Sequence, residues 1–148
     1  MLEIQGLFSM FSIGELSKRT EVKVPTIRYY EEVGLLPAAE RTEGNQRRYN
    51  EAGLERLSFI KHARELGFSV EAIASLIDLQ NHPDQTCQAA NDIAVAQLED
   101  VRQKIRKLRS LQKELKRISE GCNGAGTSGE CCVLASLADH SLCGTNKH

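Results

Sequence analysis

Tryptophan is absent from this sequence, and aromatic residues of all kinds make up only 5% of its 148 residues. With so few large apolar side chains, a large globular core is not expected, and helix packing should supply much of the burial. The length fits one domain, or a small domain with an appendage.

Long apolar runs are also missing. No stretch approaches the ~20 apolar residues that a membrane-spanning helix needs. The first ten residues lack the basic start and hydrophobic centre of a signal peptide, and Met10 offers an alternative start that would make residues 1–9 an extension. We therefore expect a cytoplasmic protein without a membrane partner.

A strong net charge is missing as well. The formal charge is −1, so the chain as a whole is not drawn to nucleic acid or to membranes. Any DNA binding has to rest on local clusters of basic residues.

The residues after Met10 predict a helix-turn-helix. Ser12 caps a short helix through Lys18, a three-residue connector follows, and a second helix runs from about Val24 to a stop at Gly34. Two short helices joined by such a turn are typical of DNA-binding domains.

A small wing is expected next. Gly44 and Asn45 predict a tight turn between two short extended segments. A third helix then runs from its cap at Asn50 to about Leu66, and Ser69 caps a fourth.

A long helix is predicted from about residue 86 to residue 120, where no Pro or Gly occurs. Apolar residues recur there at heptad-like steps: Leu98, Val101, Ile105, Leu108, Leu111, Leu115 and Ile118. An isolated helix with one apolar stripe is poorly stable in water, so a partner helix is implied. Because the chain has no second long amphipathic helix, we favour a homodimer over a four-helix core within one chain.

Cysteines bracket this helix. Five are present, and in the cytoplasm they are expected to be reduced ligands or reactive thiols. The 35 residues from Cys87 to Cys122 span roughly 50 Å at about 1.5 Å per residue. A straight helix cannot bring these two thiols to one ion, whereas two antiparallel chains can. The sequence therefore predicts a metal site shared across a dimer.

The loop between Cys122 and Cys131 is rich in glycine, so its backbone can fold tightly around an ion. Thiolates are soft ligands that select zinc, cadmium, mercury, lead or monovalent copper over hard cations. Three interpretations of Cys132 are open. It replaces Cys131 as a metal ligand, adds a fourth ligand, or faces the core of a short helix over residues 132–138.

The other thiols are weaker candidates. For Cys87 considered alone, we favour a small buried hydrophobe over a metal ligand. Cys143 and His140 lie in a polar tail, where we interpret them as bystanders.

Basic residues cluster on the predicted helix-turn-helix and wing. Lysine and arginine there can pair with phosphate oxygens, and arginine can read guanine edges. An ordinary solvated surface is the alternative, because nearby acids dilute the charge. The side chains of Tyr29 and Tyr30 point about 100° apart on the helix, so we expect one in the core and the other in contact with a DNA phosphate. The predicted DNA-binding residues are Lys18, Lys23, Thr26, Arg28, Tyr29, Arg41, Arg47, Arg48 and Tyr49.

Short motifs along the chain form a recognisable set: Ile13-Gly14-Glu15-Leu16, Thr26-Ile27-Arg28-Tyr29-Tyr30-Glu31, Gly34-Leu35-Leu36, Arg41-Thr42-Glu43-Gly44, Arg48-Tyr49 and Leu66-Gly67-Phe68-Ser69. Together they resemble the MerR family of bacterial transcription regulators over residues 11–137. The resemblance implies antiparallel long helices in a dimer and winged domains on the two halves of a palindromic promoter. It also implies activation by distorting an overlong promoter spacer, so that RNA polymerase engages both promoter elements.

The cysteine positions resemble the metal-responsive branch of that family. Cys87 is similar to the thiol that begins the dimerisation helix in regulators of divalent metals, which disfavours monovalent copper. The spacings of 35 and 9 residues resemble the mercury and lead sensors, whereas the wing and fourth helix resemble the zinc sensor. The binuclear site of that zinc sensor needs a Cys and a His where this chain has Asn123 and Thr127, which places two bound zinc ions in doubt.

We therefore predict a mainly α-helical protein of four segments. They are a winged helix-turn-helix DNA-binding domain (11–81), a long antiparallel dimerisation coiled-coil helix (85–121), a metal-binding loop with a short helix (122–138) and a disordered tail (139–148).

The predicted function is metal-responsive transcription regulation rather than enzymatic catalysis. The expected ligands are Cys122 with Cys131 or Cys132 of one chain and Cys87 of the other, holding zinc, cadmium or lead ahead of mercury. One alternative is a redox or electrophile sensor on the same scaffold, with reactive Cys131 and Cys132. Another is a small metal carrier or thiol enzyme.

Overall fold

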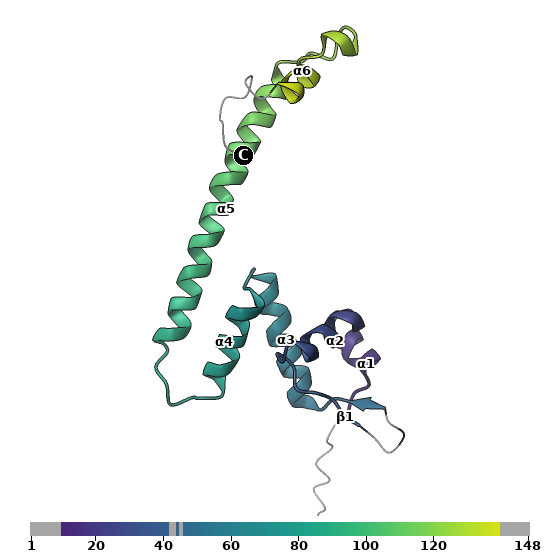
Figure 1. Ribbon diagram of the computed structural model, residues 1–148, viewed down its shortest axis with the longest axis vertical. Helices are drawn as coiled ribbons and strands as arrows, with labels where there is room; N and C mark the ends of the chain where they lie inside the picture. The colour runs from purple at the N-terminus through teal and green to yellow at the C-terminus, as the bar shows by residue number, and fades with distance from the viewer. Residues whose placement is uncertain (1–9, 42–43, 45, 140–148) are drawn as a thin grey trace, which may run out of the picture. The chain divides into compact units, whose positions relative to one another are not determined.

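The structure is a computed structural model that describes residues 10–41, 44 and 46–139. Within these residues, helices dominate and the strands form one hairpin (Figure 1). The mainly α-helical prediction is confirmed. The chain divides into two compact units, Met1–Ile93 and Ala94–His148. In chain order the elements are α1 (Ile13–Thr20), α2 (Val24–Glu32), β1 (Glu40–Arg41), β2 (Arg47–Arg48), α3 (Glu51–Glu65), α4 (Val70–Gln80), α5 (Gln88–Glu120), the 3-10 turn η1 (Ser128–Glu130) and α6 (Cys132–Ala138).

Side-chain caps start three helices of the first unit, as predicted. The Oγ atoms of Ser12 and Ser69 and the Oδ1 of Asn50 each accept the backbone N–H three residues on, at 2.9–3.1 Å. Each cap satisfies a donor that the helix start would otherwise leave unpaired. No side-chain cap forms at the start of α2, but Pro25 in its first turn has no N–H to satisfy.

The turn between α1 and α2 has the predicted length of three residues but begins one residue later than expected. α1 continues past Lys18 to Thr20, whose hydroxyl donates to the carbonyl of Leu16 at 2.8 Å. Glu21 then adopts a φ of 59°, in the left-handed region. Its carboxylate lies 3.3 Å from the Lys61 ammonium on α3, so the turn is tied to the helix behind it.

The core of the first unit lies between α1, α2, α3 and α4. Burying each aliphatic side chain there contributes about 1.5–3 kcal/mol, so this cluster is the main source of the unit's stability. Its largest fully buried side chains are Leu16, Ile27, Leu36, Leu57, Ile60 and Ile73.

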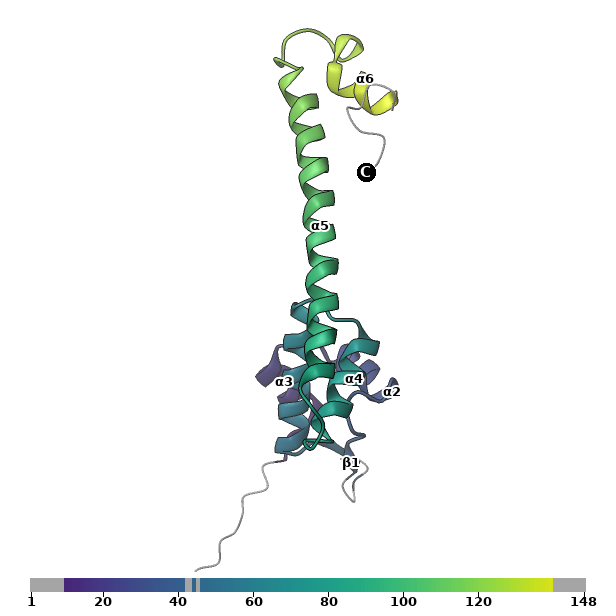
Figure 2. The same ribbon diagram turned by 90° about the vertical axis from the view of Figure 1, so that its left-hand side faces the viewer.

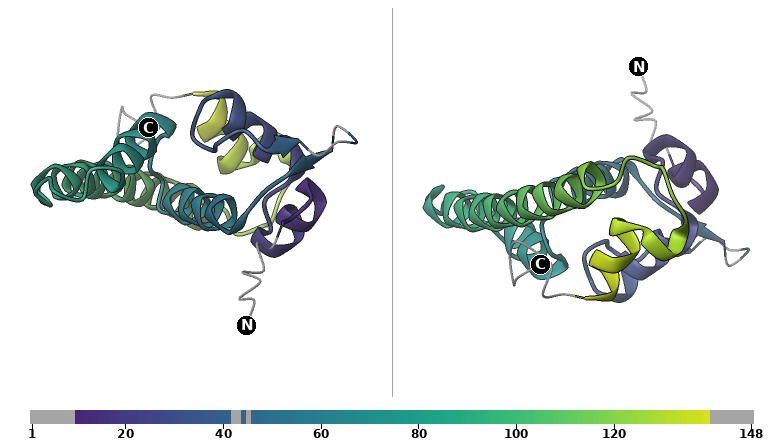
Figure 3. Two further views of the ribbon diagram at one scale, coloured as in Figure 1. Left: turned by 90° about the horizontal axis from the view of Figure 1, so that it is seen from below. Right: turned by 90° about the horizontal axis from the view of Figure 1, so that it is seen from above.

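A hairpin forms the predicted wing. β1 and β2 pair antiparallel, with Arg41 opposite Arg47. The predicted turn includes Asn45, which lies outside the described residues. At the base of the hairpin, Phe11 and Tyr49 exchange two backbone hydrogen bonds of 2.7 and 2.8 Å. Figure 3 shows the ribbon of the hairpin and of α1 from two further sides. The wing is thereby anchored to the segment that leads into α1.

α5 is uninterrupted from Gln88 to Glu120 (Figure 2). The predicted helix is confirmed, with a start about two residues later than expected. In the single chain much of its apolar stripe faces solvent, and Leu98, Ile105, Leu108 and Leu115 are between 41% and 64% exposed. Ion pairs between charged side chains occupy positions of α5 outside the stripe.

No helix in the described ranges is long and apolar enough to cross a membrane.

The second unit has little core of its own. Across residues 94–139, the buried side chains are Glu114, Ile118 and Ser136. A loop follows α5, and α6 then forms over the two turns predicted from the sequence (Figure 2). Nearly all of the predicted tail, residues 140–148 with His140 and Cys143, lies outside the described part of the chain, as do residues 1–9.

Candidate metal centre and nucleic-acid interface

The loop after α5 is built by backbone turns. Cys122 donates its N–H to the carbonyl of Ser119 at 3.1 Å, which closes the end of the helix. The Asn123 side chain then accepts the N–H of Ala125 at 2.9 Å and turns the chain. Gly124 and Gly126 have φ values of 75° and 91°, which side chains rarely permit. These two glycines therefore allow the tight loop that the sequence predicted.

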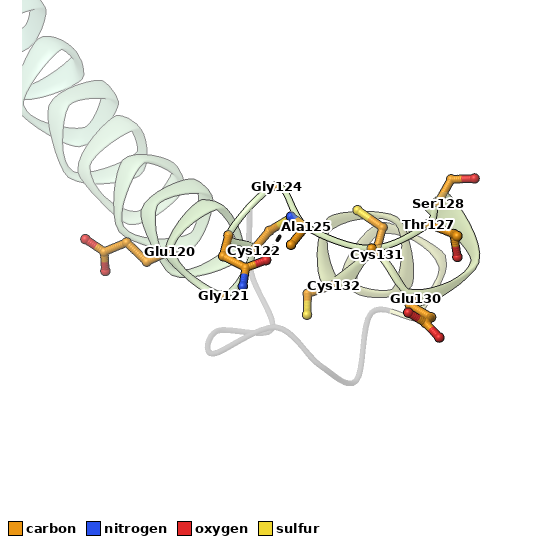
Figure 4. A pocket seen from close by; sticks show the side chains of 12 residues that line it. Glu120, Gly121, Cys122, Gly124, Ala125, Thr127, Ser128, Glu130, Cys131 and Cys132 are labelled. Carbon is orange, nitrogen blue, oxygen red and sulfur yellow. Dashed lines mark hydrogen bonds between the residues drawn. The ribbon is translucent and has the colours of Figure 1, made fainter.

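This loop surrounds a hollow of about 440 Å³ (Figure 4). Cys122, Cys131 and Cys132 all line it. Cys122 and Cys131 are half-buried, whereas Cys132 is exposed. In Figure 4 the side chains of Cys131 and Cys132 point to opposite sides. The adjacent thiols therefore do not face a single point.

Cys131 has the surroundings of a metal ligand. Its pKa is below the ordinary value of a thiol, mainly because the backbone N–H of Leu134, and next that of Val133, stabilise the thiolate. Partial burial opposes this effect, and a hydrogen bond with the Cys122 thiol adds to it. The thiolate is the form that binds a soft ion.

The donor set of the loop fits a soft ion. Two neighbouring sulfur atoms, one of them favoured as thiolate, are the chemistry that zinc, cadmium, lead and mercury select. Across residues 10–41, 44 and 46–139, no three His, Cys, Asp or Glu side chains of the single chain gather closely enough to hold a metal ion. The loop thus supplies a pair of thiols.

Cys87 lies in the first unit, directly before α5. It is exposed, and its carbonyl accepts the N–H of Asn91 at 3.0 Å in the first turn of the helix. The reading of Cys87 as a buried hydrophobe is therefore wrong. The thiol borders an apolar hollow of about 360 Å³. Other residues that line this hollow are Phe59, Leu76, Leu79, His82 and Pro83.

The predicted DNA-binding side chains differ in exposure. Thr26 on α2 and Arg48 on β2 are half-buried. The Arg47 side chain lies outside the described atoms, although its backbone belongs to β2. The exposed members of the set are Lys18, Lys23, Arg28, Tyr29 and Arg41.

The two neighbouring tyrosines divide as predicted. Tyr29 is 46% exposed, whereas Tyr30 is 6% exposed and belongs to the core. Tyr49 differs from the other predicted contacts, because it is 3% exposed and its hydroxyl donates to the carboxylate of Glu31. The sequence gave no sign of this partner, which lies 18 positions away.

Two protein families match overlapping parts of the chain. The family described as MerR HTH family regulatory protein matches residues 11–80, and the one described as MerR, DNA binding matches residues 54–118. The HTH-type transcriptional regulator ZntR of Escherichia coli (strain K12) is 43% identical over 130 residues, covering 86% of this chain and 92% of the relative. The chain belongs to the MerR family.

Solved MerR-family structures extend this likeness. PbrR691 from Ralstonia metallidurans CH34, solved in complex with lead(II), is 40% identical, with a TM-score of 0.73 over 86% of this chain and 98% of that chain. The MerR regulator of Bacillus megaterium MB1, solved in complex with mercury(II), is 30% identical, with a TM-score of 0.66 over 87% of this chain and 100% of that one. The MerR resemblance drawn from the sequence motifs is therefore confirmed.

Proposed function

We propose that this MerR-family protein is a homodimeric transcription regulator that responds to a soft divalent metal ion. The observation that supports this most directly is the pairing of Cys122 with Cys131 in one loop after α5. Cys87 directly precedes the same helix. In this proposal residues 11–81 bind promoter DNA, residues 85–121 dimerise, and residues 122–138 bind the ion.

The metal site is shared between chains. A helix of 33 residues is about 50 Å long, which keeps its two ends apart. Antiparallel pairing through the exposed stripe of α5 brings the loop of one chain to the start of the partner's helix. The ion is then bound by Cys122 and Cys131 of one chain and by Cys87 of the partner subunit. Its positive charge attracts the three thiolates, and this attraction orders the loop. Three thiolates leave excess negative charge on a monovalent ion, so a divalent ion is favoured.

Cys131, rather than Cys132, closes the site in this proposal. Among the described cysteines, Cys131 is the one whose thiol interacts with that of Cys122, and Cys132 points to the other side of the chain (Figure 4). Asn123 turns the loop where a second thiol would be needed for two ions. We infer one ion per site, with zinc, cadmium and lead ahead of mercury.

DNA recognition uses the helix-turn-helix and the wing. Exposed lysines and arginines on α1, α2 and β1 meet phosphates and base edges, and each half of the dimer takes one half of a palindromic promoter. Ion binding orders the loops and shifts the two wings. The promoter is thereby distorted into a form on which RNA polymerase engages both elements.

A redox sensor on the same scaffold is the second candidate. The hydrogen bond between Cys131 and Cys122 favours it. A hydroperoxide would take two electrons and two protons from these thiols, forming their disulfide with release of water and an alcohol or a second water. Promoter activation by hydroperoxide, but not by metal ions, would support this candidate.

The test is a titration of the reduced dimer with each ion, following thiolate–metal absorption and promoter transcription together. Cys87→Ser is expected to abolish metal-dependent transcription while DNA affinity stays unchanged, because the thiol lies outside the helix-turn-helix and the wing. Cys132→Ser is the matched control and is expected to respond as the wild type does. If induction survives Cys87→Ser intact, the shared site is wrong.

A further inference from the structure

Tyr49 lies at a junction of three segments. It directly follows β2 of the wing, and its backbone pairs with Phe11 ahead of α1. The Phe11 ring is in turn 4.5 Å from the guanidinium carbon of Arg19 on α1. The Tyr49 hydroxyl donates to the carboxylate of Glu31 on α2. Tyr49 thus links the wing to α2 through its buried side chain, and to the segment ahead of α1 through its backbone.

The wing needs such a link. Each of its strands has two residues, and a two-stranded hairpin of this size has little rigidity of its own. Its basic side chains can bind the same duplex as α2 only if the angle between hairpin and helix is fixed. A hydrogen bond to an ionised carboxylate is stronger than one between neutral groups.

Glu31 is well placed to set that angle. It lies three residues after Arg28, so the two side chains are neighbours on the surface of α2. A carboxylate beside an arginine that contacts phosphate would repel DNA if it turned outward. The bond from Tyr49 draws this carboxylate toward the base of the wing.

We propose that Tyr49 is a positioning residue for DNA recognition, which fixes the wing relative to α2 through Glu31. The inference rests on the proposed function, because it assumes that the chain binds promoter DNA. It revises the role predicted from the sequence, in which Tyr49 contacts DNA itself.

Promoter affinity of the full-length dimer provides the test, measured below the melting temperature of every variant. Tyr49→Phe removes the hydroxyl and keeps the buried ring, and it is expected to weaken promoter binding by about tenfold. Tyr30→Phe is the matched control: it removes the hydroxyl of another buried tyrosine and is expected to bind as the wild type does. Glu31→Gln keeps an acceptor oxygen and should lose far less affinity than Tyr49→Phe.

A double-mutant cycle separates positioning from direct contact. If Tyr49 acts through Glu31, then Tyr49→Phe has no further effect in a Glu31→Ala background. A direct phosphate contact predicts the same loss in both backgrounds, and that result overturns the inference. A purely structural role lowers the melting temperature while promoter affinity stays at the wild-type value, which also overturns it. A wild-type dimer that binds no promoter DNA overturns the proposed function itself.

Discussion

Cys131 and Cys132 are adjacent in sequence, yet their chemistry differs. Cys131 directly precedes α6, where N–H groups of the first turn stabilise a negative charge on its sulfur. Cys132 is the first residue of α6 and points to the other side of the chain (Figure 4). One position along a helix start therefore decides which thiol pairs with Cys122.

The lowered pKa of Cys131 predicts how its reactivity depends on pH. Alkylation requires the thiolate, so its rate rises with pH until the pH exceeds the pKa. For the reduced, metal-free protein, the rate at Cys131 should level off at a lower pH than the rate of free N-acetylcysteinamide. Peptide mass spectrometry after timed alkylation measures this. In denaturant, which separates Cys131 from the N–H groups of α6, the two profiles should coincide.

The sequence predicted the candidate site only in part. The glycine-rich segment between Cys122 and Cys131 correctly predicted that both lie in one loop, because a short, conformationally permissive loop keeps its ends close. It left the choice between Cys131 and Cys132 open, because that choice depends on where the first turn of α6 begins. The bond between Tyr49 and Glu31 was missed for a related reason, since contacts between distant positions leave no local pattern.

At the scale of elements, α5 is defined by what it leaves exposed. Its apolar stripe has the heptad-like spacing of a helix that pairs with another helix, and much of the stripe faces solvent in the single chain. Leu108, Leu111 and Leu115 border one groove along it.

The helix caps and the α5 periodicity were predictable from sequence because both are local signals. The longer course of α1 was not, because it depends on the back-bonded hydroxyl of Thr20.

A charge in the stripe should separate the chains. Leu108 is 64% exposed, so Leu108→Lys changes little within one chain. In the proposed dimer each chain then contributes one lysine to the apolar contact between the two α5 helices. We expect dimerisation to weaken about a hundredfold or more. Sedimentation equilibrium measures the effect. Lys113→Ala, on the opposite face of α5, is the control, and an equal loss there would contradict pairing through this stripe.

At the scale of the whole molecule, the proposed site makes each chain incomplete. The loop of one chain supplies two thiols, and the third comes from the partner's Cys87. An arrangement of this kind couples ion binding to the geometry of the dimer, because each ion ties the second unit of one chain to the first unit of the other.

Mixed dimers test this sharing directly. Homodimers of Cys87→Ser and of Cys131→Ser should each lose the intact three-thiolate site. A dimer of one chain of each kind keeps one complete site, formed by Cys122 and Cys131 of the first chain and Cys87 of the second. Purification with two different tags, followed by metal titration, should give one tightly bound ion per mixed dimer. A site within one chain predicts none.

The near absence of a core in residues 94–139 has a consequence for the life of the protein in the cell. With Glu114, Ile118 and Ser136 as its buried side chains, this part of the chain has little to resist a protease until α5 pairs with a second copy as proposed. Newly made chains are therefore expected to be short-lived as monomers and long-lived as dimers. Degradation of unpaired chains then sets a lower limit on the concentration at which the regulator accumulates.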